Sequence, residues 1–260
     1  MHFKNKKSLG QNFLIDNNIL KKIVEVGKIS KDDEILEIGP GTGNLTKYIL
    51  EKRPRSLTVV EKDHRLTKIL EKKFENNIKI VNNDVLRLSG NFYKYKYIIF
   101  GNLPYNISTK ILANWCLNKK IQYKKLVLMF QKEVADRIIA KVDTENYSRI
   151  TILANWKFNI KKLFDINPQC FFPKPKIKST LLEFTPKKNF VEFANPYNLE
   201  KVTRIMFNQK RKMIKKNFIK LFKNFELISK KINIKLTDRP QNISIDKFIL
   251  IVKEYEKNLN

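Results

Sequence analysis

Four consecutive residues, Asn102-Leu103-Pro104-Tyr105, combine an amide, a proline-constrained backbone and an aromatic ring. Pro104 fixes its own φ and disfavours a helical Leu103, so the neighbouring carbonyls stay available as acceptors. The Asn102 amide oxygen and a carbonyl of Leu103 or Pro104 can then accept both hydrogens of one amino group, while the Tyr105 ring stacks on the attached base. The segment therefore predicts a binding site for the exocyclic amine of a base, although it also fits a simple strand-to-helix turn.

The amine of adenine is a poor nucleophile, because its lone pair is delocalised into the ring. Two acceptors on its hydrogens favour a more localised lone pair that points at an electrophile. Positioning of this kind supplies a large part of the rate enhancement. The segment is thus typical of group transfer to a base amine.

A glycine-rich turn, Gly39-Pro40-Gly41-Thr42-Gly43, follows an apolar stretch at 34–38. Glycines allow positive φ and close approach of a ligand to the backbone, and the helix predicted after the turn points its N-terminus at the same place. The spacing matches neither the dinucleotide fingerprint Gly-x-Gly-x-x-Gly nor a phosphate-binding loop that ends in Gly-Lys-Ser/Thr. We therefore expect Gly39 and Gly41 to line a nucleotide pocket of another kind.

Two carboxylates follow the next predicted strands. Glu61 comes directly after 57–60, about 20 residues beyond the glycines, which is where a carboxylate binds a ribose diol in related folds. Asp84 comes just after 78–81, where it can accept a hydrogen bond from an adenine amino group. A helix-capping role is the alternative for the Glu61-Lys62-Asp63 cluster, and it fits Asp63 better than Glu61.

Helical and strand patterns alternate through residue 184. Strands are predicted at 34–38, 57–60, 78–81, 97–100, 125–131, 158–166 and 177–184, and helices at 17–27, 109–116, 132–141 and 148–156. This alternation predicts an α/β fold with a mainly parallel sheet. Because the carboxyl ends of parallel strands meet at one edge, Gly39, Glu61, Asp84 and Asn102 are expected to lie together there.

The pattern changes between Pro186 and Pro196, and the rest of the chain is predicted to be helical without strands. We therefore predict an α/β domain at 1–186 and a helical domain at 187–260. One predicted helical face in the second domain carries a cluster of basic residues, namely Lys210, Arg211, Lys212, Lys215 and Lys216. Such a cluster is typical of contacts to a phosphate backbone, with solvated surface charge as the alternative.

The connector at 167–176 contains three prolines, which hold it extended, and two adjacent phenylalanines, Phe171 and Phe172. An exposed phenylalanine on this loop can stack on a base opposite Tyr105. A ring plugged into the sheet is an equally good interpretation for either position, and the spacing alone leaves the choice open.

The 260 residues include 53 Lys plus Arg against 25 Asp plus Glu, a formal net charge of +28. A field of this sign attracts a polyanion, and RNA or DNA is the obvious partner. The bias towards Lys and Asn is also what genomic nucleotide composition produces, so the sign is more informative than the magnitude.

The longest apolar runs are far too short to span a bilayer. A motif-like segment already begins at Ser8, which leaves no room for a signal or transit peptide before it, so a cytoplasmic location is expected. Cys116 and Cys170 lie in apolar or aromatic surroundings and are expected to be reduced thiols. With only two histidines in the chain, no metal site is predicted.

Nine segments occur in one order across almost the whole chain: Ser8–Leu14, Glu37–Gly43, Val60–Asp63, Asn83–Asp84, Gly101–Ser108, Gln131–Val134, Phe171–Lys176, Phe207–Lys212 and Arg239–Ser244. Together they resemble the ribosomal RNA adenine N6,N6-dimethyltransferase family, a group of small-subunit ribosomal RNA methyltransferases. Each segment is weak evidence by itself, whereas nine in the right order are very specific.

The resemblance implies a class I (Rossmann-like) methyltransferase fold with a seven-stranded sheet whose final strand is reversed. It also implies a catalytic domain at 1–186, whose N-terminal segment closes the site, and a small all-helical domain at 187–260 that binds rRNA. The methyl donor would be S-adenosylmethionine. By motif position, Asn12 and Leu14 close the site over the cofactor. Gly39 contacts its methionine end, Glu61 binds its ribose hydroxyls and Asp84 binds its adenine amino group. Asn102 contacts both the methyl donor and the target amine, and Phe171 stacks with Tyr105 on the target base.

The implied reaction is dimethylation of N6 of two adjacent adenosines in the 3′-terminal hairpin of 16S rRNA, in the immature small ribosomal subunit. The oligomeric state is open, with a monomer as the default expectation. A macrolide-resistance-type 23S rRNA adenine methyltransferase shares the glycine loop and Asn102–Tyr105, but the proline loop and Arg239–Ser244 favour the small-subunit enzyme. A DNA adenine methyltransferase is disfavoured because no target-recognition domain is visible. A non-catalytic ribosome assembly or transcription factor on the same fold is disfavoured by the intact Glu61 and Asn102.

Overall fold

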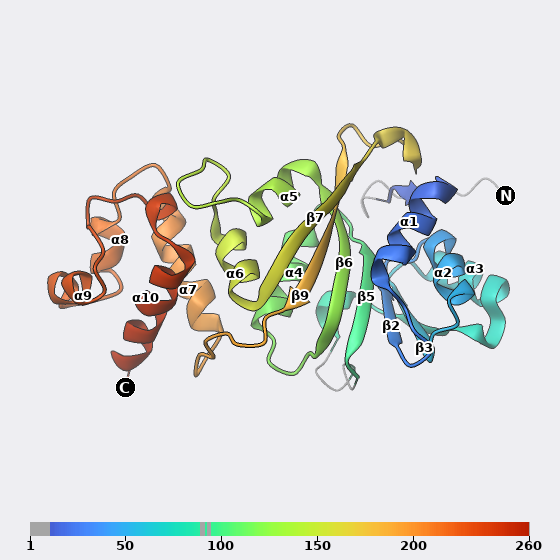
Figure 1. Cartoon of the computed structure of the whole chain (residues 1–260), viewed down its shortest axis with the longest axis horizontal. Coiled ribbons are helices and arrows are strands. Elements are labelled where there is room, and N and C mark those ends of the chain that lie inside the picture. Colours follow the sequence, from blue (N-terminus) through green and yellow to red (C-terminus); the bar gives the residue numbers. More distant parts are fainter. Residues whose placement is uncertain (1–10, 89–91, 93–94, 260) are drawn as a thin grey trace. The chain divides into compact units, whose positions relative to one another are not determined.

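The computed structural model describes residues 11–88, 92 and 95–259 (Figure 1). The chain divides into two compact units. Unit 1 runs to Trp115 and also contains Lys120–Ala135 and Asn159–Pro186, and unit 2 contains Cys116–Lys119, Asp136–Phe158 and Lys187–Asn260. The helix predicted at 148–156 is therefore grouped with the C-terminal helices, and the division of function at residue 186 stays a prediction.

Unit 1 is organised around a seven-stranded sheet of order β4-β3-β2-β5-β6-β9-β7. Its strands are β2 (Glu34–Ile38), β3 (Ser56–Glu61), β4 (Lys79–Asn82), β5 (Tyr97–Asn102), β6 (Tyr123–Gln131), β7 (Phe158–Ile166) and β9 (Ser179–Pro186). Strands β2 to β6 pair in parallel, and β9 pairs antiparallel with β6. The mainly parallel α/β fold and the reversed final strand are thus confirmed. Strand β9 begins two residues later than expected, because Ile177 lies exposed in the proline loop.

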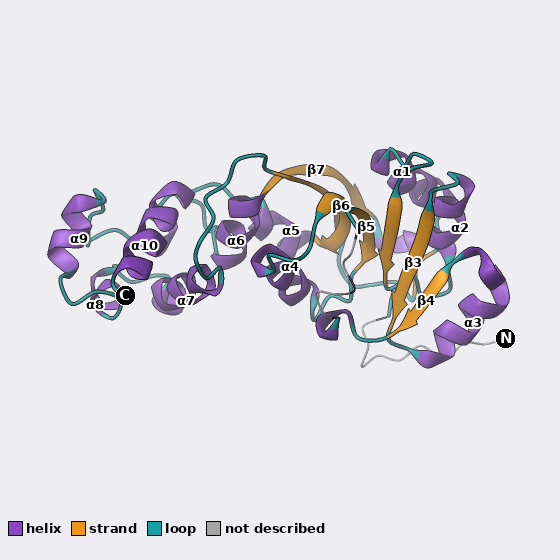
Figure 2. Cartoon of the chain, turned by 90° about the horizontal axis from the view of Figure 1, so that it is seen from below, coloured by secondary structure: helices purple, strands orange, loops and turns teal. Residues whose placement is uncertain are grey.

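Helix α1 (Asn17–Gly27) precedes these strands in the chain. The connections between them contain α2 (Asn44–Glu51), α3 (His64–Phe74), α4 (Ser108–Leu117), α5 (Lys132–Ile138) and α6 (Arg149–Lys157). Figure 2 shows helices flanking the strands of the sheet. Helix α5 ends three residues before the predicted Lys141. Its last carbonyls instead accept side-chain donors, Thr151 Oγ1 on the Arg137 carbonyl and Asn155 Nδ2 on the Ile138 carbonyl, which end the helix.

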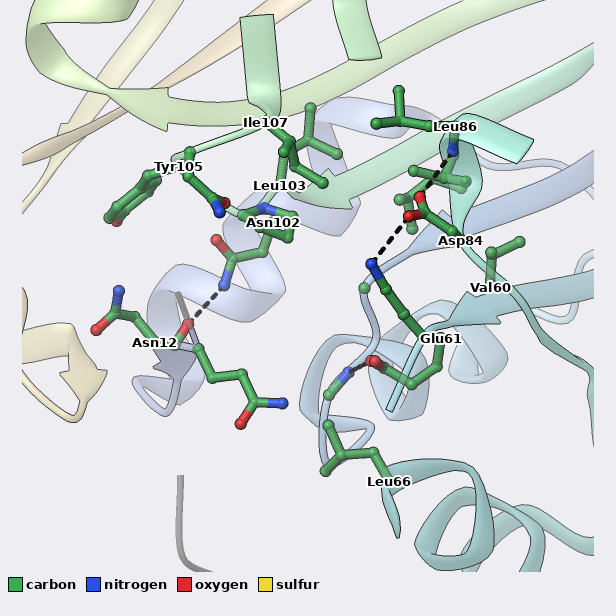
Figure 3. Close-up of a pocket in the computed structure, with 18 of the residues that line it drawn as sticks. Asn12, Val60, Glu61, Leu66, Asp84, Leu86, Asn102, Leu103, Tyr105 and Ile107 are labelled. Carbon is green, nitrogen blue, oxygen red and sulfur yellow. Dashed lines mark hydrogen bonds and ion pairs between the residues drawn. The ribbon is translucent and has the colours of Figure 1, made fainter. Parts of the chain in front are cut away.

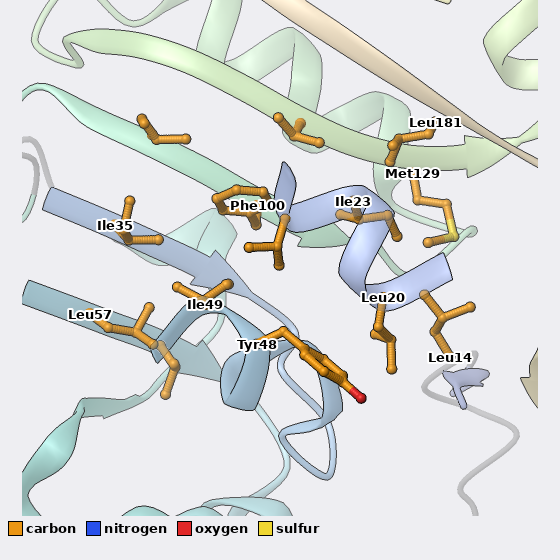
Figure 4. Packing of buried hydrophobic residues seen from close by; sticks show 14 of the residues in the cluster. Leu14, Leu20, Ile23, Ile35, Tyr48, Ile49, Leu57, Phe100, Met129 and Leu181 are labelled. Atoms are coloured by element: carbon orange, nitrogen blue, oxygen red, sulfur yellow. The ribbon is translucent and has the colours of Figure 1, made fainter. Parts of the chain in front are cut away.

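The core of unit 1 forms between α1, α2 and the central strands (Figure 4). Leu20 and Ile23 of α1, Ile35 of β2, Ile49 of α2 and Phe100 of β5 are all at most 2% exposed and belong to one cluster. Helix α1 begins where the side chain of its capping residue accepts the Ile19 N–H. The central strands therefore pack tightly against α1 and α2, and this packing fixes the position of the loops that follow the strand ends.

A two-stranded ribbon outside the main sheet was not expected from the sequence. Strand β1 (Phe13–Leu14) pairs antiparallel with β8 (Phe171–Phe172), and Phe13 lies opposite Phe172 while Leu14 lies opposite Phe171. Two residues per strand are too few for alternation to be recognised in a sequence. The ribbon fixes the segment that precedes α1 to the proline loop. The predicted motif at Ser8–Leu14 is described only from residue 11 onward.

Unit 2 is helical, as predicted for the C-terminal region, with α7 (Tyr197–Met206), α8 (Lys215–Ile219), α9 (Phe225–Lys231) and α10 (Ile245–Lys257). Val202 and Met206 of α7, with Phe248 and Ile251 of α10, are fully buried. Over the described part of the chain, none of the helices has both the length and the apolar character that a membrane crossing requires.

Candidate active site at the carboxyl edge of the sheet

A pocket opens at the carboxyl ends of the parallel strands (Figure 3). The predicted site residues that line it are Asn12, Gly39, Gly41, Glu61, Asp84, Asn102, Leu103, Pro104 and Tyr105. Figure 3 shows Asn12, Asn102 and Tyr105 on one side of this pocket and Glu61 and Asp84 on the other. Four separate strand ends are thus brought together, as the parallel topology requires.

The side chain of Asn102 is oriented by the segment before α1. Its Nδ2 donates to the Asn12 carbonyl oxygen over 2.9 Å, between residues 90 apart in the sequence. The amide oxygen consequently faces away from that contact and is available as an acceptor. Asn102 is half-buried and its neighbours Gly101 and Leu103 are buried, so the amide lies at the boundary between core and pocket.

The two predicted backbone acceptors differ in how far they are already used. The Pro104 carbonyl accepts the Ile107 N–H over 3.1 Å and is used in the turn that leads into α4. No donor in the described part of the chain reaches the Leu103 carbonyl, while the Leu103 side chain is 1% exposed and packs over Gly101. The Pro104 carbonyl is thus already used once, while the Leu103 carbonyl is unused; which of the two accepts from the target amine stays a prediction.

The ring of Tyr105 is fixed at its far end. Its hydroxyl lies 2.6 Å from Ser179 Oγ at the start of β9, and Ser179 is fully buried. Burial raises the pKa of the Tyr105 phenol above its usual value, and the Ser179 hydrogen bond only partly offsets this effect, so the hydroxyl is neutral at physiological pH. Sequence reasoning missed Ser179, since a serine at a strand start carries no distinguishing signal.

Gly41 holds the turn between β2 and α2 close to the pocket. Its φ is +61°, and a Cβ atom added there would lie 2.6 Å from the Phe13 ring. A side chain at this position would therefore be strained and would displace Phe13. The adjacent Asn44 donates from Nδ2 to the Leu14 carbonyl over 2.8 Å, which ties the glycine turn to the segment before α1.

Glu61 is 8% exposed and lines the pocket. Its two carboxylate oxygens accept the Asp63 N–H at 2.9 Å and the Gly41 N–H at 3.2 Å. Burial raises the pKa of Glu61 above its usual value, and these two backbone bonds oppose that shift. Each oxygen keeps a second lone pair, so the carboxylate can also accept two hydroxyl donors from a ligand.

A second carboxyl group, that of Glu37, lies behind the glycine turn at 2% exposure. Burial raises the pKa of Glu37 to about 7, and the charge of Glu61 adds to that shift, while the 2.7 Å bond from Thr46 Oγ1 opposes it. Near neutral pH, Glu37 is therefore partly protonated. This arrangement limits the negative charge that accumulates beneath the pocket.

Asp84 caps the turn after β4. Its Oδ1 accepts the Leu86 N–H at 3.0 Å and its Oδ2 lies 3.0 Å from Lys62 Nζ. Burial by itself would raise the pKa of Asp84. The two contacts, to the Leu86 N–H and to Lys62, oppose this effect and outweigh it, so the pKa lies below its usual value and the carboxylate is charged. The carboxylate can still accept an amino group through its remaining lone pairs.

Apolar side chains complete the lining of the pocket. Those at its wall are Ile38, Leu66, Val85, Leu86 and Ile107. Two acidic acceptors beside apolar side chains, with a glycine turn nearby, fit a nucleoside: hydroxyls for Glu61, an amino group for Asp84 and a flat base against the apolar side chains. Sequence reasoning missed Leu86 and Ile107, because single apolar residues in turns carry no periodic signal.

Two predicted site residues do not line the pocket. The Leu14 side chain is 6% exposed and belongs to the core, so Leu14 acts here through its carbonyl, the acceptor for Asn44. Phe171 is 3% exposed in the same core, whereas Phe172 is 62% exposed. Neighbouring residues of a strand point to opposite faces, so the ribbon exposes one ring and buries the other. As placed here, Phe171 offers no ring face to a base.

Comparisons with known proteins find relatives that match nearly the whole chain. The model of the family "Ribosomal RNA adenine dimethylase" matches residues 2–257. The ribosomal RNA small subunit methyltransferase A of Pelagibacter ubique is 54% identical over 259 residues, covering 98% of both chains. The protein of the same name from Malacoplasma penetrans is 43% identical over 247 residues, covering 94% of this chain and 89% of that protein.

Two solved structures share the fold. A dimethyladenosine transferase from Plasmodium falciparum has a TM-score of 0.77 and 26% identity, and the match covers 94% of this chain and 98% of that one. The 23S rRNA methyltransferase ErmE has a TM-score of 0.68 at 23% identity, covering 94% and 99%. The second likeness concerns the fold alone.

Proposed function

We propose, from the premise that this chain belongs to the ribosomal RNA adenine dimethylase family, that its pocket methylates N6 of adenosines in small-subunit rRNA. The observation that carries the proposal is the Asn102 amide, which the Asn12 carbonyl orients so that its oxygen is left as an acceptor beside the Leu103 carbonyl. Two acceptors of this kind suit the two hydrogens of an adenine amine.

The more specific substrate is two adjacent adenosines of the 3′-terminal hairpin of 16S rRNA in the immature small subunit. The names of relatives that match nearly the whole chain at 54% and 43% identity support the choice of small-subunit rRNA, and the position of the adenosines follows from the family resemblance. The net charge of +28 suits a polyanionic substrate. Those relatives also favour this substrate over 23S rRNA, for which the ErmE match supplies a likeness of fold only.

The pocket fits S-adenosylmethionine, which supplies an electrophilic methyl group when bound. Glu61 would accept the ribose hydroxyls and Asp84 the adenine amino group. Gly39 and Gly41, both with positive φ, would let the backbone approach the cofactor. The segment with Asn12 and Leu14 would close over it.

The residues of the chain act on the target amine mainly by positioning it. Asn102 Oδ1 and the Leu103 carbonyl would accept the two N6 hydrogens, and Tyr105 would stack on the adenine once it leaves the RNA stack. No strong general base is required, because the methylated ammonium is acidic enough to lose its proton to water. A second stacking ring from Phe171 stays a prediction, since that ring is buried in the structure.

We expect Glu61→Gln to weaken S-adenosylmethionine binding about 10- to 100-fold, because hydrogen bonds to a charged acceptor are worth about 1.5–3 kcal/mol. In the wild type the affinity should fall as the pH decreases through the raised pKa of Glu61, since only the ionised carboxylate keeps all its acceptor sites. Calorimetric titration across pH measures both effects. An affinity that stays equally pH-dependent in Glu61→Gln would contradict the role of this carboxylate.

Removal of the Ser179 hydroxyl tests the orientation of Tyr105. We expect Ser179→Ala to lower kcat/KM for methyl transfer about 2- to 10-fold, the worth of one neutral hydrogen bond. Tyr105→Phe should give a similar loss, and the double variant should lose no more than either single one. Ser229→Ala, which removes a buried hydroxyl bonded to the Glu226 carbonyl in unit 2, is the matched control. Additive losses would show that the two hydroxyls act independently.

The function is tested with purified protein, labelled S-adenosylmethionine and small ribosomal subunits that lack methylation of the 3′-terminal hairpin. Nuclease digestion and mass spectrometry should locate dimethyladenosine at two adjacent positions of that hairpin. Label in large-subunit RNA alone would instead place the protein with the resistance-type enzymes. Tight subunit binding without any label would indicate a non-catalytic assembly factor.

Three further expectations stay predictions. They are that the helical region 187–260 binds rRNA, that the protein is a monomer and that it is cytoplasmic. Several residues of the predicted basic cluster, Arg211, Lys212, Lys215 and Lys216, are exposed, which supports the first of them. Lys210 is partly engaged, because its ammonium group contacts the Glu145 carbonyl.

A further inference from the structure

We propose that Phe172, with the exposed lysines Lys174, Lys176 and Lys178, forms a platform on which an unpaired nucleotide next to the target adenosine stacks. This inference rests on the proposed function and specifies how the RNA strand is held outside the pocket. The ligand is a single-stranded RNA segment, bound by its base on Phe172 and by its phosphates on the lysines.

Phe172 lies on the same face of the ribbon as Phe13, a residue that lines the pocket. Its ring is 62% exposed, an unusual state for a phenylalanine beside a binding site. It lies directly opposite Phe13 in the β1–β8 pair, and residues directly opposite in such a pair share one face. Phe13 lines the pocket, so Phe172 lies at its rim, one strand further out.

The platform is held in place by backbone contacts. The Ile15 N–H donates to the Cys170 carbonyl over 2.8 Å, which extends the ribbon beyond its two residue pairs. At the other end of the loop, the Lys132 N–H donates to the Lys178 carbonyl over 2.9 Å. Pro175 between them is buried. A loop backbone held in this way can present the ring to a base without a large loss of backbone conformational entropy.

Three exposed ammonium groups follow the ring at alternate positions, separated by Pro175 and Ile177. No ion pair involving Lys174, Lys176 or Lys178 is found in the described part of the chain. A positive track beside an exposed aromatic ring is the combination that binds single-stranded nucleic acid: the cations follow the phosphates and the ring stacks on a base. Charge complementarity thus favours RNA over an apolar protein partner.

The nucleotide on Phe172 differs from the one that reacts. Tyr105 is the aromatic ring of the pocket, tied to Ser179, and it serves the target adenine. Phe172 lies one strand beyond Phe13, and it is Phe13 that lines the pocket. The ring of Phe172 therefore does not stack on the target adenine inside the pocket. Two separate rings therefore suit two consecutive nucleotides, the reacting one in the pocket and a neighbour on the rim.

Steady-state methylation of small subunits that lack the modification tests the platform. We expect Phe172→Ala to raise KM for the subunits about 10-fold, a typical effect of removing one stacking ring, while kcat and S-adenosylmethionine affinity stay unchanged. Phe172→Trp should restore wild-type KM, whereas Phe172→Leu should resemble Phe172→Ala, because leucine keeps apolar surface but has no ring. Tyr95→Ala removes another exposed aromatic ring, just before β5 at the opposite edge of the sheet, and should leave KM unchanged.

A photo-crosslinking amino acid at Phe172 gives a direct readout that does not depend on turnover. The crosslink should map to a nucleotide adjacent to a methylated adenosine. Crosslinking to a ribosomal protein, together with normal KM in Phe172→Leu, would overturn the inference in favour of a protein contact. If the wild-type protein is active and Phe172→Ala leaves KM unchanged, the platform is overturned but the proposed function stands. If the wild-type protein methylates none of the RNAs, the proposed function itself is overturned.

Discussion

Asn102→Ala is expected to lower kcat for methyl transfer about 100- to 1,000-fold, the loss typical of removing one group that stabilises or positions the reacting atoms. The variant removes the side-chain acceptor for the target amine and the bond to the Asn12 carbonyl. Single-turnover methylation of saturating small subunits measures the effect. Thermal unfolding should change little, because Asn102 is only half-buried.

Two further variants separate the role of the Asn102 amide from a general effect of its loss. Asn102→Asp keeps the shape but replaces the donor with an acceptor that repels the Asn12 carbonyl, so it should be nearly as inactive as Asn102→Ala. Asn77→Ala is the matched control: its amide also donates to a backbone carbonyl, that of Phe74, but at the opposite edge of the sheet. Full activity in Asn102→Asp would contradict the proposed orientation.

The second large effect concerns stability. Phe171→Ala is expected to lower the free energy of unfolding by about 3–5 kcal/mol, because it empties a ring-sized volume in the core shared with Leu14 and Leu20. Urea unfolding monitored by circular dichroism measures it as a lower midpoint at unchanged slope. Phe171→Leu fills most of the volume and should recover part of the loss.

The neighbouring residue supplies the control for this prediction. Phe172→Ala should change the free energy of unfolding by less than about 0.5 kcal/mol, because its ring is mostly exposed. If Phe171 were instead the stacking ring that the family resemblance implies, Phe171→Ala would raise KM for the RNA at nearly unchanged stability. The two phenylalanines thus separate a core role from a binding role within one dipeptide.

The sequence predicted the architecture that brings the site together. Apolar strands followed by glycine, acidic or asparagine residues place Gly39, Glu61, Asp84 and Asn102 at one edge, because parallel strands all end there. This inference needs only the order of elements and the rule for parallel sheets. The family, too, could be recognised from nine short segments in order, and the comparisons confirm it.

Other features depend on contacts between residues far apart in the chain. Asn102 is oriented by the Asn12 carbonyl and Tyr105 by Ser179, and no local pattern contains either pair. The difference between the Leu103 and Pro104 carbonyls depends on a turn that already uses the Pro104 carbonyl once. Local propensity states which groups are able to accept hydrogen bonds, but only the folded chain determines which of them are already used.

The same distinction applies to Phe171 and Phe172. Both lie in one extended loop with identical side chains, so the sequence determined that an aromatic ring reaches this region but not which one. The tertiary structure decided it through the pairing of β1 with β8, where Leu14 and Phe171 share the face that packs on the core and Phe13 and Phe172 share the other. A shift of the register by one residue would exchange the two rings, because side chains alternate along a strand and pairing alone fixes the face.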